Sequence, residues 1–198
     1  MTGPLLTLLA VLLYAMLHSL MATFQAKRRA GKTFGELGQR GHRLFYNLLA
    51  VLTFLPVLGV VAAFPGQFIY HWTWPWLAIS SLGQLLAVLL LVLGLLETDV
   101  WHFLGLRQIL SGYAANESGE LQTNGLYRYV RHPLYSAGLL FIWLTPVMTT
   151  SVLSLNIALS IYLYIGSTLE ERRLVRQFGQ AYEAYRQCVP RLIPCIKW

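Results

Sequence analysis

The stretch LYSAGLLFIWLTPVMTTSVLSLNIALSIYLYIGST, residues 134–168, decides the fold of this chain. It contains no charged residue. It is too long for one membrane crossing, which takes about 20 apolar residues, but short for two. Its one polar break is the segment 145–151, which includes Pro146. The stretch therefore crosses the membrane either once or twice, in the second case as a tight hairpin that turns near Pro146.

Composition places the whole chain in a membrane. Of its 198 residues, 56% are hydrophobic and only 12% are charged, and the mean hydropathy is +0.54. A soluble domain has about a quarter charged residues. Three further apolar stretches, residues 5–24, 44–64 and 74–96, each have about the length of one helical crossing. We expect a single membrane domain over residues 1–198.

The cations decide how many crossings there are. All fifteen Lys and Arg lie in the segments 27–43, 107–131 and 172–197, whereas the loop 65–73 has none. Loops rich in Lys and Arg stay on the cytoplasmic side, and only two crossings by residues 134–168 put all fifteen there. The sequence thus predicts an all-α integral membrane protein with five transmembrane helices, the last two a tight hairpin. The N-terminus is then outside, and the C-terminus is cytoplasmic.

The sequence also predicts the structure of two segments outside the membrane crossings. Residues 25–43 combine six cations with four glycines, and we expect a flexible basic loop there. Near the C-terminus, apolar side chains recur every three or four residues, which predicts one cytoplasmic amphipathic helix. These side chains are Leu174, Phe178, Tyr182 and Tyr185.

The segment Arg131-His132-Pro133 begins the fourth crossing. Proline favours the first turn of a helix and pushes the preceding residue into an extended conformation, so His132 is expected near the N-cap. The free amides at that helix end favour an anion, such as the carboxylate of an amino-acid cofactor. The alternative is that Arg131 and His132 are interfacial anchors and that Pro133 only starts a helix.

The pair Glu170-Glu171 follows the same apolar stretch, in a segment otherwise rich in cations. As exposed ion pairs with Arg172 and Arg173, these acids would contribute at most ~1 kcal/mol. A ligand that carries a ribose diol and a sulfonium cation would make fuller use of two adjacent carboxylates. Ligand binding and simple anchoring both remain open for this pair.

His18 lies inside the first apolar stretch, about two helical turns from its end. Ionisable side chains within a membrane are costly, and they indicate a functional site by default. A histidine that is hydrogen-bonded to a neighbouring helix is the equally weighted alternative.

The segments around these residues resemble one known family. The motifs GLYRYVRHPLY (125–135), Glu170-Glu171 and FGQAYEAY (178–185), with Pro190 and Pro194, are similar to the isoprenylcysteine carboxyl methyltransferase and phospholipid methyltransferase family, over residues 119–194. The resemblance implies a cytoplasm-facing pocket for S-adenosylmethionine. The cofactor-binding residues that it implies are Glu120, Leu121, Gln122, Tyr127, His132, Pro133, Leu134, Tyr135 and Glu170. The candidates for catalysis are Arg131, Glu171 and His18.

The first half of the chain resembles a particular branch. His18-Ser19-Leu20 and RLFYN (43–47) are similar to bacterial methanethiol-type methyltransferases and to membrane proteins associated with nitric-oxide reduction. One departure concerns the acceptor. In the prenylcysteine enzymes, an arginine one turn before the cofactor glutamate meets the substrate carboxylate, whereas this chain has Gly166. We therefore expect a small thiol or a lipid-like acceptor rather than a carboxylate.

Two other functions are also compatible with the sequence. A NADPH-dependent sterol-type reductase has a similar Arg-His-x-x-Tyr pattern, although such enzymes have longer chains. A non-catalytic membrane assembly protein on the same scaffold is the other alternative. The net charge of +7 follows from the cytoplasmic placement of cations, so no nucleic-acid partner is expected. The absence of Cys/His ligand spacing predicts no metal.

Overall fold

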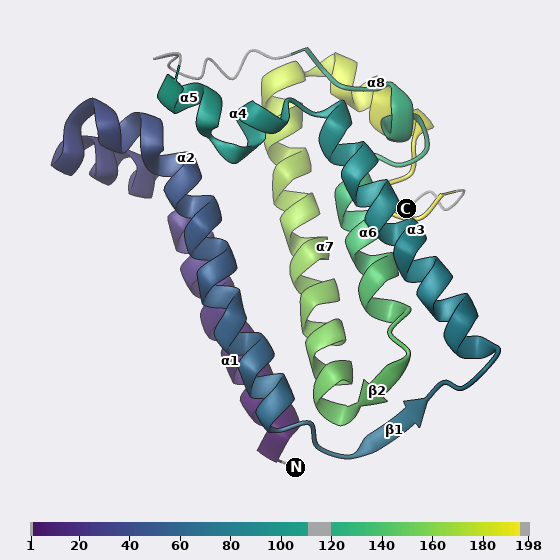
Figure 1. Cartoon of the computed structure of the whole chain (residues 1–198). Helices are drawn as coiled ribbons and strands as arrows, with labels where there is room; N and C mark the ends of the chain where they lie inside the picture. The colour runs from purple at the N-terminus through teal and green to yellow at the C-terminus, as the bar shows by residue number, and fades with distance from the viewer. Residues whose placement is uncertain (1, 111–119, 195–198) are drawn as a thin grey trace. The chain divides into compact units, whose positions relative to one another are not determined.

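The computed structural model describes residues 2–110 and 120–194 (Figure 1). Gly119, at the edge of the predicted cofactor region, lies outside the described residues. In chain order the elements are α1 (Thr2–Met21), α2 (Phe24–Ala63), β1 (Phe68–His71), α3 (Trp76–Glu97), α4 (Val100–Leu104), α5 (Leu106–Leu110), η1 (Gly125–Arg128, a 3-10 helix), α6 (Pro133–Trp143), β2 (Val147–Thr149), α7 (Thr150–Phe178) and α8 (Gln180–Cys188).

The chain forms two compact units. One unit contains α1, α2, α4, α5 and the start of α7, and its helices α1 and α2 run side by side (Figure 1). The other contains α3, η1, α6, the rest of α7 and α8, and here α3 packs along α6. The strands β1 and β2 pair with each other.

Four helices among the described residues are long and apolar enough to cross a membrane: α1, α2, α3 and α7. The predicted all-α integral membrane class is therefore confirmed. Helix α6 is also apolar but has only 11 residues, which at 1.5 Å per residue gives about 16 Å. This length is about half the thickness of the hydrocarbon layer.

The decisive stretch 134–168 breaks where its sequence predicts. Helix α6 ends at Trp143, and α7 begins at Thr150, with Pro146 and the short strand β2 between them. The backbone of this break is paired with the β1 segment, since the Trp72 amide donates to the Pro146 carbonyl at 2.9 Å. The break is thus an ordered turn, in which the strand pairing satisfies backbone groups that the helices leave free.

The segment 25–43 is helical, so the prediction of a flexible loop was wrong. Its Ala, Lys, Arg, Gln and Glu residues are strong helix formers, and they outweigh the four glycines. Only Gly35 departs from helical geometry, with φ +61° and ψ −141°. A positive φ is accessible to glycine at no steric cost, so Gly35 marks a fold within α2 instead of a loop.

The single C-terminal helix that was predicted is divided in the structure. Helix α7 continues to Phe178, Gly179 adopts φ +53°, and α8 begins at Gln180. The four-residue spacing of apolar side chains continues across this glycine, which is why the sequence pattern gave no sign of the division. The separate α8 places Tyr182 in a buried position.

Small and polar residues of α3 hold α6 in place. A Cβ atom on Gly94 would lie 3.0 Å from Leu134, and one on Gly83 would lie 2.5 Å from Leu144. The Ser80 hydroxyl donates to the Leu144 carbonyl, and the Gln84 amide donates to the Phe141 carbonyl at 3.2 Å. Close approach at small residues and hydrogen bonds between helices are the usual means of packing helices in membranes. They fix the orientation of α6 and therefore of the residues that begin it.

Candidate functional site

The N-terminal end of α6 is joined to the C-terminal segment of the chain. His132 is the N-cap and Pro133 the first helical residue, as the sequence predicts. The Arg131 amide donates to the Pro190 carbonyl at 2.9 Å, and the His132 amide donates to the Arg191 carbonyl at 3.1 Å. These two bonds place residues 190–191 directly beside the Arg-His turn.

Arg131 is buried, and its guanidinium is held on all sides. Its Nε and Nη2 atoms each lie 2.7 Å from Oε1 of Glu171 on α7. Its Nη1 donates to the carbonyl of Arg186, which is in α8, and to that of Val189, which directly follows α8. Arg131 thus links α6, α7 and the end of α8, and it makes the charge-assisted bonds for which a guanidinium is suited.

Glu171 is the centre of this network. Its side chain is only 3% exposed, and its second oxygen, Oε2, accepts from Arg191 Nη2 at 2.9 Å. Arg191 also donates to the Thr168 hydroxyl at 3.0 Å. Both carboxylate oxygens of Glu171 are therefore engaged by protein cations. Such a buried ion pair contributes little net free energy of folding. Removing one partner is destabilising, because the other charge is then buried without compensation.

His132 lies between the two glutamates. Its Nε2 is 3.3 Å from Glu171 Oε1, and its Nδ1 is 3.6 Å from Glu170 Oε2. Burial lowers the pKa of His132, but the hydrogen bonds and charges of both glutamates outweigh burial and raise it above its usual value. The Tyr135 ring stacks on the imidazole at 5.4 Å between centroids and fixes its plane. The geometry favours a protonated imidazole that bridges two carboxylates.

Glu170 is the accessible acid of the pair. Its side chain is 34% exposed, in contrast to that of Glu171. The charge of Glu170 also reaches Tyr127: burial first, then the charges of Glu170 and Glu97, raise the pKa of Tyr127 to about 12. Tyr127 therefore stays protonated at neutral pH.

Glu97, at the end of α3, positions the segment that carries Tyr127. Its two oxygens lie 3.0 and 2.9 Å from the Leu126 amide, and Gly125 turns the chain with φ +61°. This positive φ favours glycine, and a Cβ on Gly125 would in addition lie 2.1 Å from a Glu97 carboxylate oxygen. The Tyr185 hydroxyl then donates to the Tyr127 carbonyl at 2.6 Å. Sequence reasoning missed this role of Glu97, although Asn124-Gly125 is a turn signal.

Tyr182 of α8 adds one buried hydroxyl with no hydrogen-bond partner among the described residues. The residue is 1% exposed, and burial, together with the charge of Glu171, raises the pKa of its hydroxyl. An unpaired buried polar atom is costly, so it indicates a place where a water or a ligand group completes the network.

An apolar cavity of about 680 Å³ lies in the same unit as this network. Its wall includes one stripe of α6, and the rest comes from α3, η1, α7 and the C-terminal segment. The lining residues are Leu90, Leu126, Tyr129, Val130, Pro133, Ser136, Ala137, Leu139, Leu140, Trp143, Ser160, Leu192, Ile193 and Pro194. The Ser136 hydroxyl donates to the Leu192 carbonyl, and Trp143 Nε1 donates to the Ser160 hydroxyl. The wall therefore suits hydrocarbon better than a polar ligand.

His18 lies in the other unit, where it pairs with a tyrosine. Its Nε2 is 2.7 Å from the Tyr46 hydroxyl of α2, and the Tyr14 ring stacks on it at 5.5 Å. One turn before Tyr46, Arg43 donates to the His102 ring and to the His102 carbonyl at 3.0 Å. The hydrogen bond to a neighbouring helix is the alternative that the sequence left open for His18.

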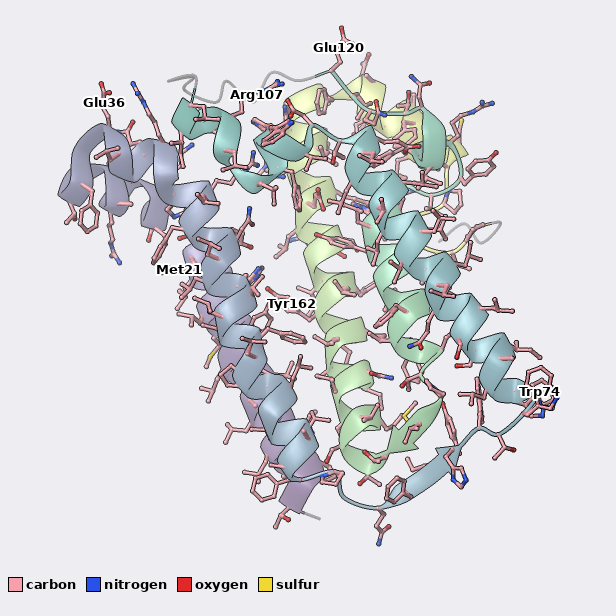
Figure 2. The ribbon with its side chains drawn as sticks, viewed as in Figure 1. Met21, Glu36, Trp74, Arg107, Glu120 and Tyr162 are labelled. Carbon is pink, nitrogen blue, oxygen red and sulfur yellow. The ribbon has the colours of Figure 1, made fainter. Side chains whose placement is uncertain are left out.

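Apart from His18, the predicted residues fall into three groups. Arg131, His132, Glu170 and Glu171 converge in the network, with Tyr127, Pro133 and Tyr135 around it. Leu134 packs against Gly94 of α3. Glu120, Leu121 and Gln122 precede η1, and Glu120 extends outward (Figure 2). Arg191 was missed, because a single arginine between two prolines matches no pattern.

Comparisons with known proteins agree on one family. The family model for phospholipid methyltransferases matches residues 82–181. The chain is 31% identical to a methanethiol S-methyltransferase of Crocosphaera subtropica over 93% of this chain and 72% of that protein. It is 33% identical to methanethiol S-methyltransferase 2 of Bradyrhizobium diazoefficiens, with 96% and 73% covered. It is also 33% identical to a protein-S-isoprenylcysteine O-methyltransferase of Schizosaccharomyces pombe, over half of each chain. No solved structure matches the chain.

Proposed function

Because this chain belongs to the phospholipid methyltransferase family, we propose that it transfers a methyl group from S-adenosylmethionine to a thiol or lipid-like acceptor reached from the membrane. The observation that carries the proposal is the meeting of the Arg131–His132 turn with the Glu170–Glu171 pair, about 40 residues apart in sequence, in one buried network. Residues 1–198 act as one methyltransferase domain, with residues 119–194 as its cofactor region.

Glu170 is the group that meets the donor in this proposal. It is the accessible carboxylate of the pair, and it suits a ribose diol or a nearby sulfonium cation. The Tyr127 ring, whose hydroxyl pKa is raised in part by the charge of Glu170, is the proposed face for a cation. The Tyr182 hydroxyl, which has no hydrogen-bond partner among the described residues, offers a further polar contact. The residues present therefore fit such a donor. His132, residues 133–135 and residues 120–122 complete the proposed binding set.

Arg131 and Glu171 then serve as positioning residues, because their polar atoms are bound to other protein groups. When bound, the donor supplies a methyl group on a sulfonium, which is already a good leaving group. The protein's task is to orient donor and acceptor, and orientation alone is worth several kcal/mol. The network does this by fixing His132, which contacts Glu170, and by pairing the backbone of residues 190–191 with that of residues 131–132.

The apolar cavity supports an acceptor with a hydrocarbon part. A volume of about 680 Å³ falls in the range of sites for drug-sized ligands. Its stripe on α6 begins at Pro133, directly after His132, so an amphiphile can place its tail in the cavity and its reactive end beside the polar network. A thiol acceptor would also have to lose its proton. We keep His18, paired with Tyr46, as the candidate proton acceptor for that case.

We also propose the membrane arrangement that the cations favour. Helices α1, α2, α3, α6 and α7 are the five membrane segments, with α6 reaching only part of the way through the bilayer. The N-terminus is outside, while α8 and the polar network are on the cytoplasmic side. The donor is made in the cytoplasm, so this orientation gives it direct access.

The test is calorimetric titration of S-adenosylmethionine into the full chain in lipid nanodiscs. Glu170→Gln is expected to weaken binding at least about tenfold, the loss of one charge-assisted contact. The matched control, Glu183→Gln at an exposed position of α8, is expected to bind as the unaltered chain does. Equal affinity in all three proteins would show that Glu170 is not part of a binding site for S-adenosylmethionine.

Methyl transfer itself is tested with a labelled donor and a panel of thiols and membrane lipids. Labelled product supports the proposed activity. Intact donor binding with no product from any acceptor class would favour the non-catalytic alternative. A rise in melting temperature with NADPH, and none with S-adenosylmethionine, would favour the reductase.

A further inference from the structure

The first part of α2, residues 24–42, folds back on itself, and we call it the basic hairpin. The positive φ of Gly35 separates two helical arms, residues 24–34 and 36–42. A Cβ on Gly38 would lie 2.1 Å from the Ala30 carbonyl oxygen. Eight residues along a straight helix span about 12 Å, so this approach requires the arms to lie against each other. Figure 1 shows the hairpin beside the Met21 end of α1.

The hairpin carries a strong excess of positive charge. It contains five Lys and Arg and only one acid, Glu36. Glu36 is paired with Arg40 of the same arm at 2.7 Å, and its side chain points outward (Figure 2). The first arm therefore has no carboxylate of its own to balance its four cations, which are Lys27, Arg28, Arg29 and Lys32.

Two large apolar side chains flank the fold of the hairpin. Phe34 is 70% exposed and Leu37 is 79% exposed, on either side of Gly35. The chain ends an apolar helix at Met21, just before the hairpin, and its next apolar run begins at Leu44, just after it. The hairpin is therefore attached at both ends to the boundary between membrane and water. Exposed Phe and Leu beside Lys and Arg are typical of helices that lie in the lipid headgroup layer.

We propose that the basic hairpin is a docking element for anionic lipid headgroups of the membrane that the chain spans. Phe34 and Leu37 enter the headgroup layer, and the cations of the first arm contact lipid phosphates. Charge complementarity selects this partner, since each Lys or Arg near an anionic lipid surface strengthens binding about fivefold. Its attachment at the membrane boundary also presents the hairpin to lipid at a high effective concentration.

The proposal is tested with the full chain in nanodiscs of neutral phosphatidylcholine, alone or mixed with phosphatidylglycerol. Leu37→Cys, combined with Cys188→Ser and Cys195→Ser, carries an environment-sensitive fluorophore at the tip. The emission is expected to move to shorter wavelength as the anionic lipid fraction rises. High salt should reverse the shift, because at 1 M salt charges are screened beyond about 3 Å. An emission that is the same in neutral and anionic nanodiscs would overturn the proposal.

Two sets of variants check the cause. Lys27→Gln with Lys32→Gln should weaken docking about fivefold for each cation removed, read from the anionic fraction at half-maximal shift. Gly38→Leu should abolish the shift, because its side chain would meet the Ala30 backbone. Gly41→Leu is the matched control, since nothing lies within 4 Å of its Cβ position. An unchanged shift in the double Gln variant would show that the tip inserts without charge, contrary to the proposal.

Discussion

The polar network around Glu171 and the basic hairpin of α2 use the same residue types in opposite ways. In the network, two arginines and a histidine surround two glutamates, and the side chains of Arg131 and Glu171 are almost completely buried. The hairpin has five cations and one glutamate, which pairs with Arg40, and most of the cationic side chains are exposed to solvent. Buried charges must be paired and hydrogen-bonded, whereas exposed charges need no partner. The difference separates a region that fixes geometry from a region that presents charge.

The largest expected effect comes from removing the central acid of the network. Glu171→Ala leaves Arg131 buried without its carboxylate, and breaking such a pair costs about 3–5 kcal/mol. We expect a large drop in the midpoint of unfolding in a denaturant titration of the detergent-solubilised chain. Glu36→Ala in the hairpin, on the same measurement, should cost less than about 1 kcal/mol.

An alternative substitution guards against simple failure to fold. Glu171→Gln keeps the shape of the side chain and one acceptor oxygen. Its midpoint of unfolding should therefore lie between those of Glu171→Ala and the unaltered chain. Equal stability of Glu171→Ala and Glu36→Ala would mean that the network is no more tightly coupled than the surface, and the comparison would fail.

Two glycines with the same backbone angle sharpen the comparison. Gly35 in the hairpin and Gly125 before the network both have φ +61°. Nothing lies within 4 Å of a Cβ on Gly35, whereas a Cβ on Gly125 would meet the Glu97 carboxylate at 2.1 Å. Gly35→Ala therefore adds backbone strain alone, on the order of 1 kcal/mol. Gly125→Ala adds the displacement of Glu97, and we expect about 2–3 kcal/mol.

Thermal unfolding of the two alanine variants checks this ranking. The reference is Gly138→Ala on α6, because Gly138 has open space at its Cβ position and no positive φ. A smaller loss for Gly125→Ala than for Gly35→Ala would show that Glu97 moves freely, and that it does not hold η1 in place.

The sequence predicted the pairing of the network but not its full membership. The expected two crossings put Arg131-His132-Pro133 and Glu170-Glu171 at the same membrane face, and the family resemblance implies that they share one pocket. In the structure the two segments are in contact. Arg191 and Glu97 could not be found in this way. Each contacts a residue of a different segment, Arg191 the Glu171 carboxylate and Glu97 the Leu126 amide. No periodic pattern in the sequence indicates such a contact.

The hairpin shows the opposite limit of sequence reasoning. Its four glycines predict flexibility from the sequence, yet Gly35 makes the fold, and Gly31 and Gly38 lie where the arms approach each other. A glycine that permits close packing and a glycine that loosens a chain look the same in sequence. The membrane class, in contrast, follows from composition alone, because length and hydropathy leave few alternatives.

The pH dependence of the melting temperature distinguishes the polar network from the basic hairpin by a smaller effect. The pKa of His132 in the folded chain is raised above its usual 6.5 by the two glutamates, despite burial. A raised pKa contributes stability that is complete below about pH 6.5 and is lost as pH rises through the folded-state value. We expect the melting temperature to fall over that interval, and His132→Gln should remove this part of the fall. Parallel pH profiles for both proteins would show that His132 does not bridge the glutamates.

The smallest effect is expected for the one ion pair of the hairpin. Glu36 and Arg40 lie four residues apart on the second arm, at 2.7 Å, and the side chain of Glu36 is 80% exposed. Exposed pairs at this spacing contribute about 0.3–0.5 kcal/mol, because water and salt screen the charges. A double-mutant cycle of Glu36→Gln and Arg40→Gln should return a coupling in that range that disappears in high salt. A salt-resistant coupling well above 1 kcal/mol would mean that the hairpin is a packed, geometry-fixing region like the network, and not a charged surface open to lipid.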